Sequence, residues 1–253
     1  MPQAGEVAVV IPARNEADRI QATVSAALKL PGVAFVVVVD DGSRDGTAIR
    51  AEKTGAIVMR HARSRGKGAA METGAETVRL LDKRDGHDTA GGTGRHLLFL
   101  DADLGETAER AGPLTEPVLA GAADMTIAVF STTVKLGGHG LVVGLSAAGI
   151  RRATGWEPRQ PLNGQRCLTR AAFEAARPLA HGFGVETALT IDLLRKGLRV
   201  TEVEVDLAHR ATGSDLRAQL HRARQLTDVA RALLFRGVKT NPPNPPPATP
   251  PAV

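Results

Sequence analysis

Asp101 and Asp103 are the residues whose type and spacing point most directly to chemistry. They are separated by one alanine and follow HLLFL, an apolar run typical of a buried strand. Two carboxylates at a strand end can bind a hard divalent cation, which prefers oxygen ligands and keeps open positions for phosphate oxygens. Such a cation stabilises charge on a departing phosphate. The alternative interpretation is a plain turn, because aspartate is common at strand ends and helix N-caps.

Three further polar loops follow apolar runs in the same way: PARNE at 12–16, DDGSRDGT at 40–47 and RSRGKG at 63–68. Carboxylates and hydroxyls in the second loop can accept hydrogen bonds from a base or a ribose. In the third loop Lys67 lies between two glycines, which let the backbone approach a phosphate while the ammonium supplies positive charge. Turn formation and helix capping favour the same residue types, so one such loop alone is weak evidence for ligand binding. The loops together are stronger evidence.

The apolar pattern predicts a scaffold that brings these loops to one edge. Short apolar runs typical of strands alternate with helical periods. The runs occupy residues 6–11, 35–39, 56–59, 96–100 and 125–130, and the helical periods occupy 17–28, 47–54 and 68–81. This order predicts right-handed crossovers and an α/β fold, with helices on both faces of a mostly parallel sheet. Ligands of such sheets bind beyond the carboxyl ends of the strands, so we expect one composite site.

The second half of the chain carries a weaker pattern. We expect helices at 137–155, 185–195 and 214–236, and a strand at 199–205. We expect one domain over residues 1–239, with halves at 1–130 and 131–239. The tail at 240–253 holds seven of the 15 prolines and is expected to be disordered.

Composition excludes several classes of protein. With 43% hydrophobic and 23% charged residues, the chain is typical of a globular protein. Its one cysteine, Cys167, excludes an intramolecular disulfide and a cysteine-built zinc site, and it fits a reducing compartment. No apolar run approaches the roughly 18 residues of a membrane span, and the N-terminus lacks the basic region of a signal peptide. We therefore expect a cytoplasmic protein.

The formal net charge of +5 is concentrated in residues 207–239, where seven basic residues are accompanied by two aspartates. The rest of the chain is balanced, so we expect no nucleic-acid partner. The predicted helix at 214–236 has an apolar stripe and a basic face. Three interpretations of it are open: a helix packed on its own domain, a homodimer contact, or peripheral contact with the inner face of a membrane.

Motifs that the sequence lacks count against several classes of enzyme. It contains no Walker A loop, no G-x-G-x-x-G after the first strand, no G-x-S-x-G elbow and no His-Glu-x-x-His pair. These absences disfavour a P-loop ATPase, a dinucleotide-dependent oxidoreductase and most hydrolases.

Four blocks, in this order and spacing, resemble the family 2 nucleotide-diphosphate-sugar glycosyltransferases of the GT-A fold: VAVVIPARNEADRI, VVVVDDGSRDGT, RGKGAAMETG and LLFLDADL. The resemblance covers residues 6–130 and implies transfer of a hexosyl group from a nucleotide-diphosphate sugar, with a UDP-sugar favoured and Mg²⁺ or Mn²⁺ as cofactor. It implies that the donor is bound by Ala13, Arg14, Glu16, Asp40, Asp41, Ser43, Lys67, Asp101, Ala102 and Asp103.

The second half is similar to the glucosyl-3-phosphoglycerate synthase and polyprenyl-phosphate glycosyltransferase branch of this family. LNGQR resembles an acceptor-side S-G-x-R stretch, which implies acceptor binding by Asn163, Gly164, Gln165 and Arg166. GFGVE resembles another segment of the branch, and it implies a catalytic or acceptor-binding role for Glu186. His209 lies where the branch has a further metal ligand in addition to Asp103. The resemblance also implies a catalytic role for Asp103. The Glu-Asp pair of typical inverting members is absent, so the stereochemical outcome stays open.

Simpler interpretations accompany these roles. Glu186 could be a helix N-terminal carboxylate that stabilises the dipole, and His209 an exposed residue at a strand end. Arg166 could clamp an acceptor phosphate with its planar fork or form an ordinary ion pair.

The implied acceptor is a phosphorylated or hydroxyl compound, either phosphoglycerate-like or a polyprenyl phosphate. Because no hydrophobic segments follow the catalytic region, a water-soluble acceptor is slightly favoured. The residues leave two alternatives open. One is a sugar-phosphate nucleotidyltransferase, although PARNE is not the Gly-rich basic loop that it requires. The other is a non-catalytic protein that binds sugar nucleotides on a degenerate transferase fold.

Overall fold

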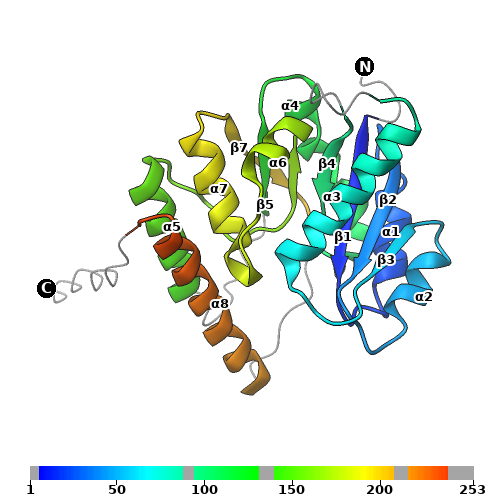
Figure 1. The fold of residues 1–253 in the computed structure, drawn as a ribbon, viewed down its shortest axis with the longest axis horizontal. Helices are drawn as coiled ribbons and strands as arrows, with labels where there is room; N and C mark the ends of the chain where they lie inside the picture. The colour runs from blue at the N-terminus through cyan, green and yellow to red at the C-terminus, as the bar shows by residue number, and fades with distance from the viewer. Residues whose placement is uncertain (1–5, 88–93, 131–139, 208–215, 239–253) are drawn as a thin grey trace, which may run out of the picture.

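A computed structural model of the chain describes residues 6–87, 94–130, 140–207 and 216–238, with side chains in the last range described from residue 223 onward. In these ranges the chain forms a seven-stranded sheet with helices on both faces (Figure 1). The strand order is β3 (Ile57–Arg60), β2 (Val33–Asp40), β1 (Val7–Ala13), β4 (His96–Phe99), β6 (Arg166–Leu168), β5 (Met125–Phe130) and β7 (Val200–Val205). The predicted α/β fold with a mostly parallel sheet is confirmed.

The first four strands of the sheet are parallel; β1, β2 and β3 end at the same level, and β4 ends three residues earlier in the register with β1. Ala13 at the end of β1 lies beside Asp40 at the end of β2, and Val10 lies beside Phe99 at the end of β4. β6 runs antiparallel to both of its neighbours, β4 and β5, whereas β5 and β7 are parallel. The sequence pattern did not predict β6, because three residues are too short to show a period.

Each face of the sheet is covered by its own hydrophobic core, since alternate residues of a strand point to opposite faces. Val9 and Ile11 of β1 pack with α1 (Ile20–Ala27) and with the 3₁₀ segment η1 (Gly105–Leu114). On the other face Val10 packs with α3 (Lys67–Arg84) and α7 (Val185–Arg195). The four short helical segments are α2 (Thr47–Glu52), α4 (Glu116–Leu119), α6 (Arg170–Ala176) and η2 (Gly182–Gly184).

A third core joins α5 (Gly140–Thr154), α7 and α8 (Leu216–Phe235), which lie side by side at the end of the molecule away from β3 (Figure 1). Gly149 in α5 allows close packing, because a Cβ there would lie 2.7 Å from Cδ1 of Leu233 in α8. α8 therefore packs on the rest of the chain, as one of the three interpretations predicted. The tail at 240–253 lies outside the described residues.

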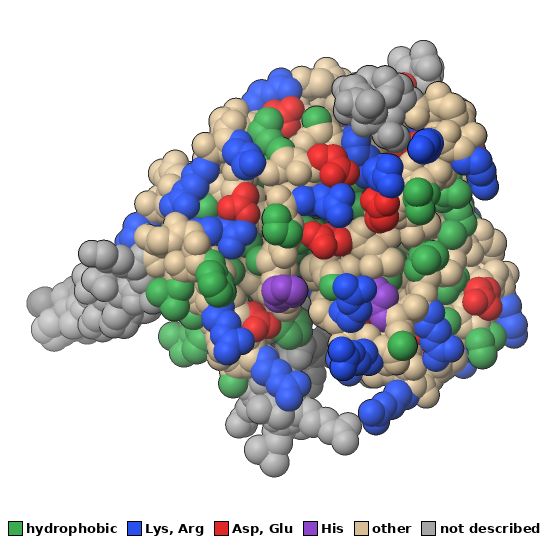
Figure 2. Space-filling view, viewed as in Figure 1, with side chains coloured by type: hydrophobic (Ala, Val, Ile, Leu, Met, Phe, Trp, Pro, Cys, Tyr) green, Lys and Arg blue, Asp and Glu red, His purple; other side chains and the backbone are tan. Residues whose placement is uncertain are grey.

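On the face that Figure 2 shows, Lys and Arg side chains are interspersed with carboxylates in the upper half, whereas the lower half carries more Lys and Arg side chains than carboxylates. None of the helices in the described ranges is both long enough and apolar enough to span a membrane.

Candidate functional site

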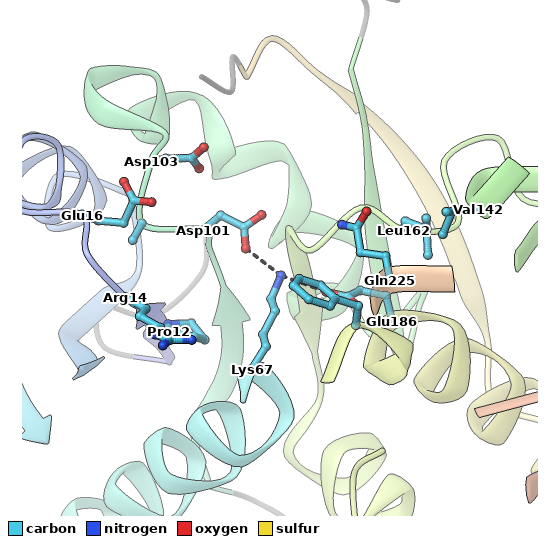
Figure 3. A pocket seen from close by; sticks show the side chains of 12 residues that line it. Pro12, Arg14, Glu16, Lys67, Asp101, Asp103, Val142, Leu162, Glu186 and Gln225 are labelled. Atoms are coloured by element: carbon cyan, nitrogen blue, oxygen red, sulfur yellow. Dashed lines mark hydrogen bonds and ion pairs between the residues drawn. The ribbon is translucent and has the colours of Figure 1, made fainter. Parts of the chain in front are cut away.

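A pocket of about 320 Å³ lies at the carboxyl ends of β1 and β4, where the predicted loops meet (Figure 3). Two walls from different halves of the chain enclose it. The first wall comes from the loops after the strands and consists of Pro12, Arg14, Glu16, Lys67, Asp101, Ala102 and Asp103. The second wall comes from the other half and consists of Val142, Leu162, Phe183, Glu186 and Gln225.

Lys67 joins the two walls. Its Nζ lies 2.7 Å from Oδ1 of Asp101 and 2.8 Å from Oε1 of Glu186. Burial disfavours the charged ammonium, but the charges of Asp101 and Glu186 outweigh it, so the pKa of Lys67 is raised well above its usual value. The pocket thus holds a permanent cation at the first residue of α3.

Gly164 is where the second half of the chain comes closest to this ion pair. A Cβ at this position would overlap Nζ of Lys67 and lie 2.9 Å from Oδ1 of Asp101. Glycine is therefore required here by space, because the backbone passes directly against the two charged groups. The structure places Gly164 behind the Lys67–Asp101 pair and outside the pocket lining.

Asp41 shapes the loop that carries Lys67. Its carboxylate accepts hydrogen bonds from Oγ of Ser64 (2.7 Å) and from the backbone N–H groups of Arg65 (2.7 Å) and Gly66 (2.9 Å), and Nδ1 of His61 lies 2.7 Å away. Burial alone would raise the pKa of Asp41, but these hydrogen bonds outweigh it and lower the pKa below its usual value. Both oxygens are thus engaged by the protein.

Asp40 and Ser43 also connect loops. Oδ1 of Asp40 accepts a hydrogen bond from the backbone N–H of Ser43 (2.8 Å), and Oγ of Ser43 accepts one from the backbone N–H of Asn15 (2.9 Å). The carbonyl of Ala13 accepts one from the backbone N–H of Asp41 (2.9 Å). Asp40 and Ser43 do not line the first pocket. Ser43, together with Arg14, lines a second pocket of about 470 Å³.

The second pocket is strongly basic. It adjoins the first pocket, because Arg14 lines both of them. Its other basic side chains are those of Arg44, Arg60, Arg63 and His61, the last three from the end of β3 and the loop after it.

Arg166 is fully buried, and its guanidinium is used inside the protein. Nε donates to the carbonyl of Asn163 (2.8 Å), Nη2 to that of Pro161 (3.0 Å), and Nη1 to that of Glu186 (3.0 Å) and to Oγ1 of Thr190 (2.8 Å). Burial lowers the pKa of Arg166 to about 10. This geometry does not fit the prediction that Arg166 clamps an acceptor phosphate, because the fork points into the interior. Arg166 instead fixes the first turn of α7, which carries Glu186.

The neighbours of Arg166 are buried as well. Asn163 accepts a hydrogen bond from the backbone N–H of Gln165 (3.0 Å) and donates one to Gln160 (3.1 Å). The Gln165 carboxamide is buried and makes no hydrogen bond within the described part of the chain. Neither residue lines the pocket, so this structure does not present them to an acceptor.

The pocket thus collects seven of the predicted site residues: Arg14, Glu16, Lys67, Asp101, Ala102, Asp103 and Glu186. His209 lies outside the described residues. Sequence reasoning missed five lining residues. Pro12, Leu162 and Phe183 belong to motifs that were recognised, whereas Val142 and Gln225 lie in helices without a local signal.

The charged side chains of the pocket fit a divalent cation that comes with an anionic ligand. The carboxylates are those of Glu16, Asp101, Asp103 and Glu186. Against two cations, Arg14 and Lys67, they leave a formal charge of −2, so a diphosphate alone would be repelled. Among the described residues no cluster of three His, Cys, Asp or Glu side chains forms a ready ligand set. Magnesium needs none, because one or two carboxylates suffice when phosphate oxygens and water complete the coordination.

Comparison with known proteins identifies a family and two curated relatives. The model of the family "Glycosyl transferase family 2" matches residues 8–141. Glycosyltransferase AglJ of Haloferax volcanii is 30% identical over 251 residues, which cover 96% of this chain and 75% of the relative. Glycosyltransferase AglD of the same organism is 29% identical over 219 residues, which cover 79% of this chain and 33% of the relative.

Among solved structures, the chain is similar to glucosyl-3-phosphoglycerate synthase from Mycobacterium tuberculosis in complex with Mn²⁺, UDP and phosphoglyceric acid. The TM-score is 0.71 at 26% identity, covering 92% of this chain and 79% of the other. A complex of the same enzyme with Mn²⁺, UDP-glucose and phosphoglyceric acid matches with a TM-score of 0.67 at 27% identity, covering 92% and 80%. The GT-A-like fold is confirmed by these matches.

Proposed function

The chain belongs to glycosyl transferase family 2, and we propose that it transfers a hexosyl group from a nucleotide-diphosphate sugar to a phosphorylated or hydroxyl acceptor. A UDP-sugar such as UDP-glucose is the favoured donor. The observation that carries the proposal is the Lys67 ammonium, held between Asp101 and Glu186 in a pocket that also contains Asp103. Family membership makes nucleotidyl transfer and a purely non-catalytic role the weaker alternatives.

The donor would bind to the first wall. Lys67 provides an ammonium for the diphosphate, which it can approach as a point charge. Because Arg14 lines both pockets, a nucleotide sugar could extend from the first pocket into the second, with its nucleoside near Ser43 and its sugar near Lys67. The similar synthase has been solved with UDP, which supports a UDP-sugar as the donor.

Asp103, assisted by Asp101, would hold Mg²⁺ or Mn²⁺, and the resemblance adds His209 as a further ligand. The bound ion would supply a Lewis acid for the leaving diphosphate. The negative charge of the pocket supports a cation that enters with the nucleotide. Lys67 contributes a second positive charge that stays in place throughout the reaction.

Glu186 would act on the acceptor from the second wall. Its backbone carbonyl is fixed by Arg166 and its carboxylate by Lys67, so its position is set from two sides. With a hydroxyl acceptor, the carboxylate would orient the hydroxyl and take its proton. With a phosphate acceptor, no base is needed and Glu186 would only position the acceptor.

The acceptor is proposed to be phosphoglycerate-like or a polyprenyl phosphate. The complex of the similar synthase with phosphoglyceric acid supports the first class. We propose a cytoplasmic location. Homodimer formation and peripheral membrane contact through α8 stay open proposals.

Thermal shift measurements with UDP and UDP-glucose, each with and without Mn²⁺, test the donor side. We expect stabilisation that requires the metal, and we expect Asp103→Ala to remove it while leaving the melting temperature of the free protein nearly unchanged. Asp18→Asn is the control, because Asp18 is exposed and does not line the pocket. Stabilisation of Asp103→Ala equal to that of the unmodified chain would contradict the metal assignment, and no response to any nucleotide would contradict the proposed donor.

A further inference from the structure

Gln225 of α8 is a pocket residue that no sequence motif predicts. It lines the second wall together with Val142, Leu162, Phe183 and Glu186. Figure 3 shows its carboxamide directed toward the middle of the pocket, with the nitrogen on the side of Asp101. Its Oε1 is buried and accepts no hydrogen bond from any residue that the structure describes. A buried polar group without a partner is unusual, and a ligand in this pocket would be able to supply one.

Asp228, one helical turn further along α8, connects this helix to the turn before Glu186. Its Oδ2 accepts a hydrogen bond from the backbone N–H of Phe183 at 3.0 Å. The contact requires the two glycines beside Phe183. A Cβ on Gly182 would overlap the Asp228 carboxylate, and a Cβ on Gly184 would lie 2.6 Å from the Asp228 carbonyl oxygen.

The spacing of the two residues links these contacts, because positions i and i+3 lie on the same side of a helix. Because Asp228 binds the 182–184 turn, Gln225 on the same side of the helix lies at the pocket, beside Phe183. Val229 and Leu233, four and eight residues after Gln225, pack into the third core and hold the same helix in place. The position of Gln225 is therefore set by packing and by the Asp228 hydrogen bond.

We propose that Gln225 binds the acceptor and that Asp228 is the positioning residue that holds it there. The inference rests on the proposed function and extends it to α8. Among the described residues of the second wall, Gln225 is the neutral polar side chain, and its neighbours are three apolar residues and Glu186. The carboxamide nitrogen can donate to a phosphoryl or hydroxyl oxygen of the acceptor, and Oε1 can accept from a hydroxyl.

Steady-state kinetics with two variants of Gln225 test this assignment. The donor is the nucleotide sugar that the unmodified chain turns over fastest in a panel, and the acceptors are 3-phosphoglycerate and a short polyprenyl phosphate. We expect Gln225→Leu to raise the acceptor KM about tenfold, the effect of losing one hydrogen bond to a charged group. Gln225→Glu should raise the KM of a phosphorylated acceptor further through charge repulsion. The donor KM should change much less than the acceptor KM.

Arg224→Gln is the matched control, since Arg224 is the exposed neighbour of Gln225 on the same helix. If Gln225→Leu behaves like this control, or if it changes the donor KM instead, the inference is overturned while the proposed function stands. If the unmodified chain turns over no nucleotide sugar with either acceptor, the proposed function fails and the inference fails with it.

Substitutions at Asp228 test the positioning role. We expect Asp228→Ala to raise the acceptor KM as Gln225→Leu does, because the 182–184 turn loses its anchor. Asp228→Asn keeps an oxygen that accepts from Phe183, so it should restore most of the acceptor affinity. Melting temperatures separate this effect from instability. If acceptor KM follows only the melting temperature across the two variants, Asp228 has no positioning role.

Discussion

The guanidinium of Arg166 donates a hydrogen bond to the backbone carbonyl of Glu186, 3.0 Å away, in the interior of the molecule. The same guanidinium binds the carbonyls of Pro161 and Asn163. One buried side chain therefore ties the segment before β6 to the first turn of α7. The position of the Glu186 carboxylate in the pocket depends on a residue that does not reach the pocket itself.

Replacing Arg166 with lysine should weaken both the fold and the site. Lysine keeps the charge but cannot reproduce the planar fork, so about two hydrogen bonds to backbone carbonyls are lost inside the protein. We expect a loss of about 2–4 kcal/mol in the free energy of unfolding, measured by urea denaturation. At temperatures where the variant is folded, we also expect a lower kcat with little change in UDP affinity. A stability equal to that of the unmodified chain would contradict the burial of this cation.

Lys67→Met should reduce nucleotide affinity. Removal of the ammonium leaves the Asp101 and Glu186 carboxylates without the cation that joins them. The diphosphate also loses a charge-assisted hydrogen bond. We expect UDP to bind about 10–100-fold more weakly, corresponding to roughly 1.5–3 kcal/mol, by calorimetry in the presence of Mn²⁺. Lys53→Met provides the control, because Lys53 is exposed after α2. Equal loss of affinity in both variants would show that general charge, and not the position of Lys67, is responsible.

Gly164→Ala should disturb the same ion pair from the opposite side. The added methyl group would overlap Nζ of Lys67 and press on Asp101, so the pair must shift. We expect a clear loss of activity and of UDP affinity. Gly144→Ala is a matched control, because a Cβ on Gly144 in α5 meets nothing within 4 Å. As a helix-interior change, it should stabilise the protein by about 0.5–1 kcal/mol. Full activity of Gly164→Ala would mean that the backbone is not packed against the pair.

Asp41 should make the stability of the protein depend on pH. Its pKa is lower in the folded than in the unfolded chain, where it returns to about 3.8. The unfolded state therefore binds a proton first as the pH falls, and the contribution of Asp41 is complete above about pH 5 and decreases below pH 4. Asp41→Asn should lower the free energy of unfolding at pH 7 by about 1–3 kcal/mol. Urea denaturation between pH 7 and pH 3 should show that this difference becomes smaller in acid.

The sequence predicted the first wall of the pocket well, because that wall depends on local rules. Each parallel strand is an apolar run and each loop follows directly, so the sequence alone assigns Lys67, Asp101 and Asp103 to one edge of the sheet. The directions in which side chains point could not be predicted as well from the sequence. The Asp41 carboxylate binds the loop at 64–66, and the Arg166 guanidinium points inward, because tertiary packing brings backbone groups of distant segments within reach of both side chains.

The second wall depends on contacts between distant segments, and a single sequence gives no signal for them. Gln225 is one polar position in an amphipathic helix, and only the docking of α8 on the 182–184 turn distinguishes it from its neighbours. β6 was missed for a related reason, since its three residues acquire strand structure from the strands on either side.

The position of β6 in the sheet also limits how the chain can be divided into fragments. A strand from the second half of the chain fills the gap between β4 and β5, which both come from the first half. A fragment ending at residue 130 would leave two strand edges open in the middle of its sheet and would be prone to aggregate. We therefore expect the two halves to unfold together, and a chimaera with a foreign acceptor half would need its own antiparallel strand in the same register.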